Sequence, residues 1–200
     1  MEIGFIISSI LLVAFAILAT YDGLYLHLMK YRLPNYRQSK TEHITHTLRA
    51  ILFPAILYFV FISSSPEYFY FGLLLVFIDI ITVGIDAYSE ENSRLWMGGL
   101  PRWEYILHLF VNGFHFATIS VFLVLKIRLE AGSVVIVNGF EEVASYSAFS
   151  WLVINLIPGA IIVALLHLLL NFQKPRNSWN GLLDRFIKKP HSAKTMVKSR

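Results

Sequence analysis

The chain has 200 residues, of which 56% are hydrophobic and 15% charged, and its formal net charge is +4. A soluble domain carries about 25% charged residues. This composition, with a mean hydropathy of +0.60, therefore predicts a polytopic membrane protein. The absence of cysteine excludes disulfides, thiolate zinc sites, iron–sulfur clusters and thiol nucleophiles, so any metal would be bound by His, Asp and Glu.

Five apolar segments predict an all-α fold with about five transmembrane helices. A spanning helix needs about 20 apolar residues. The second segment is therefore too short unless residues 42–49 form the polar foot of the same helix. The first lacks the basic n-region and cleavage site of a secretory signal, so we expect it to be retained. The segments cover residues 3–21, 50–63, 68–87, 105–127 and 149–172.

The basic residues predict the orientation of the chain. Fifteen of the 17 Lys and Arg residues lie in the loops after the first and third segments, at the start of the second or fourth, or in the tail after the fifth. Only Lys126 and Arg128 lie on the opposite side. The positive-inside rule then places the N-terminus outside and the C-terminus in the cytoplasm.

Residues 1–172 form the predicted transmembrane domain, and residues 173–200 form a basic cytoplasmic tail. Apolar residues recur in the tail with a helical period, and Lys188 and Lys189 follow them directly. This pattern indicates a short interfacial helix on the anionic inner leaflet, although a solvated basic tail is the simpler alternative. The apolar positions are Trp179, Leu182, Leu183, Phe186 and Ile187.

Histidines are concentrated on the predicted cytoplasmic side. Six of the seven lie in the cytoplasmic half of the segments or at its edge, and the seventh, His191, lies in the tail. Carboxylates accumulate at the same level. The histidines are His27, His43, His46, His108, His115 and His167, and the carboxylates are Asp22, Glu42, Asp79, Asp86, Glu90, Glu91 and Glu104.

An internal similarity relates residues 1–63 to residues 68–127, with the fifth segment outside the repeat. Asp22 and Asp86 each end a segment, and five residues later stands an ionisable residue, His27 or Glu91. Each half then has Arg-Leu and a Glu-x-x-x-His motif that begins the next segment. We therefore predict a core four-helix bundle built from two repeated helical hairpins.

The Glu-x-x-x-His spacing suits metal binding because residues four apart share one helix face. We predict six ligands, which are Asp22, Glu42, His46, Asp86, Glu104 and His108. In ligand type only, this set resembles the carboxylate-bridged di-iron four-helix bundles, which use Glu from two helices and Glu-x-x-His from two others. Here the motif is one residue longer and aspartates replace glutamates. The histidine boxes of the membrane desaturases are absent.

Seven further residues are candidates for additional ligands or for groups that support them. Asp79 and His115 lie about 10 Å deeper than Asp86 and His108, so we expect them to pair and carry protons. Each of the others also has a purely structural explanation, as an interfacial, loop or helix-packing group. These five are His27, His43, Glu90, Glu91 and His167.

Several carboxylates with few histidines favour two iron ions, or manganese. Zinc is the alternative, and heme fits less well because it leaves the carboxylates unexplained.

Three functions follow. The first is a di-iron oxidoreductase, of hydroxylase or desaturase type, that acts on a lipid-soluble substrate at the cytoplasmic face and takes electrons from a donor protein. The second is a zinc hydrolase of lipid amides or esters. The third is a proton- or metal-coupled transporter. The basic tail is explained by inner-leaflet lipid, so we expect no nucleic acid partner.

Overall fold

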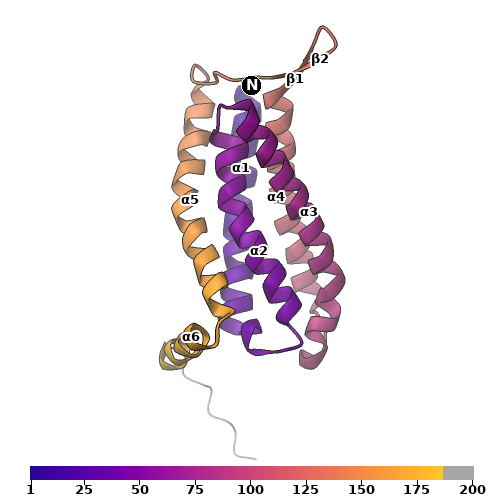
Figure 1. The fold of residues 1–200 in the computed structure, drawn as a ribbon, viewed down its shortest axis with the longest axis vertical. Helices are drawn as coiled ribbons and strands as arrows, with labels where there is room; N and C mark the ends of the chain where they lie inside the picture. Colours follow the sequence, from indigo (N-terminus) through magenta and orange to yellow (C-terminus); the bar gives the residue numbers. More distant parts are fainter. Residues whose placement is uncertain (187–200) are drawn as a thin grey trace, which may run out of the picture.

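The computed structural model describes residues 1–186, and within them it shows an all-α bundle (Figure 1). Five helical spans are long and apolar enough to cross a membrane, which confirms the predicted fold class and an integral membrane protein. Two of them contain π-helical stretches, Thr20–Lys30 after α1 and Leu57–Ile62 after α2. The long helices are α1 (Glu2–Ala19), α2 (Lys40–Ile56), α3 (Pro66–Arg94), α4 (Arg102–Lys126) and α5 (Ala144–Leu170).

The main helix contacts run between the two predicted hairpins. Helix α1 packs along α4, and α2 packs along α3, so each hairpin contacts the other through both of its helices. Helix α5 lies against α1 and α2 (Figure 1). The four helices of the two hairpins therefore form the core, and α5 covers one side of it.

The helices extend beyond the apolar runs at the end of the bundle opposite the N-terminus. We call this end the basic end, because Lys and Arg residues are concentrated there, in the loop before α2, in the loop between α3 and α4, and in α6. The π-helical stretch Thr20–Lys30, which leads into the first of these loops, is called the π segment below. Helix α2 begins at Lys40, which confirms the polar foot, and α3 continues to Arg94. The segments predicted from the sequence were too short, because an apolar run ends where these helical turns, rich in ionisable residues, begin.

Aromatic side chains fill the other half of the core. The buried rings of Phe5, Phe61, Phe122 and Phe149 contact one another at centroid distances of 4.9 to 6.3 Å. The Glu2 carboxylate accepts hydrogen bonds from the first backbone amides of α5, which joins α1 to α5. This half of the bundle is therefore apolar and closely packed.

Two smaller elements lie at the ends of the bundle. A β-hairpin, β1 (Ile127–Glu130) with β2 (Ser133–Ile136), follows α4. Helix α6 (Gln173–Phe186) covers the apolar pattern predicted in the tail, and Leu183 is buried. The Trp179 indole donates to the carbonyl of Leu28 at 3.2 Å, so α6 is attached to the π segment. Ile187, Lys188 and Lys189, which belong to the predicted interfacial helix, lie outside the described residues.

Gly72 marks a close approach between α3 and the π-helical end of α2. A Cβ atom at this position would lie 2.8 Å from Val60 and 3.1 Å from the backbone of Phe59. We therefore expect Gly72→Leu to destabilise the bundle by about 1–3 kcal/mol through overpacking. Thermal unfolding in detergent measures this effect. Gly84→Leu is the matched control on the same helix, since its Cβ meets nothing within 4 Å, and equal melting temperatures for the two variants would refute the close approach.

Candidate metal centre

Two Asp–His contacts join the hairpins reciprocally at the basic end. Asp22 in the π segment contacts His108 on α4, with 2.9 Å between Oδ1 and Nε2. Asp86 on α3 contacts His46 on α2, with 3.2 Å between Oδ2 and Nε2. Each aspartate thus reaches the histidine of the opposite hairpin, which is the arrangement that two related hairpins produce.

His27 lies between these two contacts. Its ring centroid is 4.0 Å from that of His46 and 5.9 Å from that of His108. Its Nε2 is 3.4 Å from Asp22 and 3.7 Å from Glu42. Asp22 and His27 are five residues apart, and they meet because the π-helix, bonded from each residue to the fifth one on, brings them together.

Two sets of these side chains could hold a metal ion. One consists of Asp22, His27 and His108, and the other of His27, Glu42 and His46. Within each set the ligand atoms lie within 4.8 Å of one another, and the shared His27 makes the two positions adjacent. Of the buried ring nitrogens, His27 Nδ1 has no hydrogen-bond partner, whereas His46 Nε2 lies 3.2 Å from Asp86 Oδ2. One ring nitrogen binds one ion, so a single atom of His27 can complete either set but not both, and Arg94 Nη2 lies 3.0 Å from His27 Nε2. The residue types present therefore fit a divalent ion in either set.

Glu90 orients one of these histidines. Its carboxylate lies 2.6 Å from His108 Nδ1, so it fixes the ring with Nε2 directed at Asp22. Carboxylates often hold metal-binding histidines in this way. Glu91, which the sequence comparison matched to His27, is exposed on the surface of α3. Because α3 is a regular helix here, Glu90 takes the place beside Asp86 that His27 takes beside Asp22 in the π segment.

Arg94 is the central residue that the sequence reasoning missed. The guanidinium is fully buried and binds Glu42 through two nitrogens, at 2.6 Å from Nη2 and 3.0 Å from Nε. Nη2 also lies 2.8 Å from Glu104 and 3.0 Å from His27. In the sequence, Arg94 counted as a basic loop residue and as part of the Arg-Leu pair of the repeat, but not as a residue of the site. Its spacing of four from Glu90 and eight from Asp86 places it on the same helix face, which is the pattern that could have revealed it.

Glu104 is held by other protein groups. Besides Arg94, the Tyr31 hydroxyl donates to it at 2.8 Å. The pKa of Tyr31 is raised by burial and by this hydrogen bond, so the hydroxyl stays protonated and remains a donor. Glu104 lies outside both three-residue sets, whereas His108 of the same motif belongs to one of them. The structure thus gives the two residues of this Glu-x-x-x-His motif different surroundings.

The net charge of this cluster determines what it can bind. Five buried carboxylates and one guanidinium leave a charge of −4 when the histidines are neutral. Such a charge is very unfavourable in a low-dielectric interior. Two divalent cations would neutralise it completely. The carboxylates are those of Asp22, Glu42, Asp86, Glu90 and Glu104, and the guanidinium is that of Arg94.

A second polar group lies deeper in the bundle. His115 Nε2 is 3.2 Å from Asp79 Oδ2, which confirms the predicted pairing. Arg49 on α2 completes the group, because it donates to Asp79 at 3.2 Å and to Asn112 at 2.8 Å. The sequence reasoning had counted Arg49 only as a basic residue at the start of the second helix.

His43 and His167 lie apart from the cluster, between α2 and α5. Their rings stack at a centroid distance of 5.7 Å, and both side chains are buried. Neither ring nitrogen of His43 has a hydrogen-bond partner. Neither residue belongs to the two sets that could hold a metal ion.

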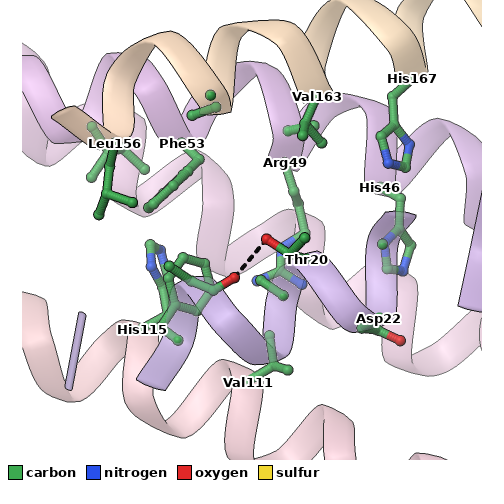
Figure 2. A pocket seen from close by; sticks show the side chains of 18 of the residues that line it. Thr20, Asp22, His46, Arg49, Phe53, Val111, His115, Leu156, Val163 and His167 are labelled. Atoms are coloured by element: carbon green, nitrogen blue, oxygen red, sulfur yellow. Dashed lines mark hydrogen bonds between the residues drawn. The ribbon is translucent and has the colours of Figure 1, made fainter. Parts of the chain in front are cut away.

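Two cavities adjoin the cluster on different sides. The α5 cavity, of about 350 Å³, lies between α1, α2 and α5, and Figure 2 shows Asp22, His46 and His167 at one of its ends. The α3–α4 cavity, of about 460 Å³, is lined by Asp86, Glu90 and His108 among others. Both reach Asp22 and His46, so the cluster is accessible to small molecules from two directions.

Arg94 should be essential for stability because its removal leaves two buried carboxylates without a counter-charge. We expect Arg94→Met to lower the free energy of unfolding by about 3–5 kcal/mol. Arg32→Met is the matched control, because Arg32 is the arginine of the corresponding Arg-Leu pair and forms a solvent-accessible ion pair with Asp184 at 2.8 Å. For this variant we expect the free energy of unfolding to fall by only about 0–1 kcal/mol. Chemical unfolding in detergent measures both, and similar losses would contradict the role of Arg94.

Comparison of the chain with protein-family models, with curated proteins and with solved structures finds no significant match. A four-helix core occurs with many unrelated functions, so the fold alone selects none of them. The function must therefore be inferred from the charges, distances and cavities around His27. These support an integral membrane protein with residue groups able to bind metal.

Proposed function

We propose that the cluster around His27 binds two iron ions and that the protein is a membrane oxidoreductase of the hydroxylase or desaturase type. The observation that carries the proposal is the pair of adjoining three-residue sets within a cluster of net charge −4. Two divalent ions would balance that charge, one bound with His27 and the other completed by a neighbouring carboxylate such as Asp86. Mixed imidazole and carboxylate ligands suit iron, and bundles that bind two irons use the same donor types.

The residues of the chain have separate roles in this proposal. Asp22, His108, Glu42 and His46 bind the ions, and His27 lies where it can bind at either position. Asp86 is a further ligand beside His46, held in place by a hydrogen bond from Thr45. Glu90 orients His108, while Arg94 holds Glu42 and Glu104 in place.

The proposed chemistry requires two co-reactants. Hydroxylation of a C–H bond consumes one dioxygen, two electrons and two protons, and it releases one water. Two redox-active metals supply the oxidising chemistry, and the electrons come from a separate donor protein. The basic end is predicted to face the cytoplasm, where such a donor is available. Asp79 and His115, paired beside Arg49, could carry protons toward the cluster.

A transporter is the second candidate, favoured by the polar group at Arg49, Asp79 and His115. Arg49 lines both cavities, so a proton or ion could pass from one cavity to the other beside it. Ionisable residues at this depth are typical of proton relays. This alternative needs no tightly bound metal, whereas the hydrolase alternative needs a single zinc.

Metal analysis of the purified protein tests the proposal. We expect about two irons per chain without a heme Soret band. His27→Ala should lose most of this iron because His27 belongs to both sets, and Glu42→Ala or His46→Ala should lose part of it. Glu91→Ala is the control, since that residue is exposed, and it should retain the wild-type content. One zinc per chain, or no metal after reconstitution, would reject the oxidoreductase.

Glu90 provides a finer test of how the centre is organised. Glu90→Gln keeps the size of the side chain but weakens the interaction with His108 Nδ1. We expect the affinity for Fe(II) to fall about 10- to 100-fold, as for other groups that orient metal ligands. Metal titration in detergent, with melting temperature as a check on folding, measures this loss. Unchanged affinity would mean that Glu90 does not support the centre.

A further inference from the structure

The α5 cavity is elongated and largely apolar, with Arg49, Asp79 and His115 in its wall, and one of its ends lies at Asp22 and His46 of the cluster. Phe53 and Leu156 lie at the end remote from Asp22 and His46 (Figure 2). Phe15 precedes Asp22 by seven residues and Ile56 follows His46 by ten, so the cavity extends about 10–15 Å along the helices. Its volume of about 350 Å³ is in the range of small-molecule sites. A slender apolar molecule therefore fits it.

The charges around this cavity exclude an anionic occupant. Arg49 is the only Lys or Arg in its lining, and its guanidinium is already bound by Asp79 and Asn112. Asp22 and Asp79 contribute two carboxylates. Among the described residues that line the cavity, no lysine or arginine is left free to bind a carboxylate or phosphate head group, whereas a hydroxyl or carbonyl could hydrogen-bond at the polar end.

The cavity opens toward the bilayer between α5 and the start of the π segment. Three of its lining residues, Thr20, Asn155 and Gly159, are exposed on the lipid-facing surface of the helices. A Cβ atom at Gly159 would meet nothing within 4 Å, so the glycine leaves open space there. The α3–α4 cavity also reaches the cluster, where Asp86, Glu90 and His108 line it.

We propose that the α5 cavity binds an uncharged single-chain lipid, taken up from the bilayer beside Gly159, with its polar end at Asp22 and His46. The inference rests on the proposed function for the reaction that follows, but binding itself requires no metal. Because the cluster lies at the polar end, the chemistry takes place near the head of the lipid. Helix α5, which is outside the repeat, thus forms the wall of the substrate site.

Photo-crosslinking in proteoliposomes tests the inference. The probe is a long-chain alcohol with a mid-chain diazirine, and mass spectrometry locates the label. In the wild-type protein we expect label at Phe53 and Leu156 that excess unlabelled alcohol removes. In Gly159→Leu this label should fall about tenfold, because the leucine side chain would fill space that the lipid occupies, and a change of about one methylene in a pocket alters binding by that factor. Gly84→Leu and Gly113→Leu, whose new side chains also meet open space, should keep it.

Three results would overturn the inference. The first is label in the wild-type protein that excess unlabelled alcohol does not remove. The second is labelling of Gly159→Leu equal to that of the wild type. The third is loss of label in Gly113→Leu, because Gly113 lines the α3–α4 cavity and not the α5 cavity. The sulfate ester of the same probe tests the class of lipid, and equal labelling by it would exclude the preference for an uncharged head. Iron content, measured on the same samples, separates the two proposals. Competable label without iron rejects the oxidoreductase alone, whereas iron without competable label rejects the lipid site alone.

Discussion

The buried cluster of five carboxylates around Arg94 is the constraint on which the rest of the structure depends. Carboxylates cannot stay ionised in a membrane protein interior unless cations balance them, and the described residues place one guanidinium and three histidines beside the five. Arg94 bridges Glu42 of one hairpin and Glu104 of the other, so it joins the hairpins where repulsion between them would be greatest. The negative charge that remains when the histidines are neutral is the basis of the proposed metal site.

The π segment adapts the first hairpin to this cluster. In the second hairpin, Asp86 and Glu90 are four residues apart on a regular helix, and Glu90 contacts His108. In the first, Asp22 and His27 are five residues apart, and the wider helical turn brings His27 to the equivalent place beside His46. One hairpin therefore contributes an imidazole where the other contributes a carboxylate. The two halves are alike in their Asp–His contacts and differ in the group that completes each.

Much of the fold and part of the site could be predicted from the sequence. Apolar runs located the five spans, and the Glu-x-x-x-His spacing selected Glu42, His46 and His108, all of which lie in the cluster. Arg94 could not be recognised by charge counting, because a buried arginine and a cytoplasmic loop arginine contribute equally to the positive-inside pattern. The π-helical register was also inaccessible, since it depends on packing. For that reason Glu91 was matched to His27 although Glu90 takes that place.

The bundle thus combines a rigid half with an accessible one. Interlocked rings of Phe5, Phe122 and Phe149 hold the helices together near the N-terminus, and the Glu2 carboxylate joins α1 to α5 there. At the basic end the same helices are separated by ionisable side chains and by two cavities. Because the aromatic half fixes the helix positions, the ligands can remain organised beside open space. The proposed chemistry on a membrane-dissolved molecule would need such a cluster held beside a largely apolar cavity, and α5 forms one wall of that cavity.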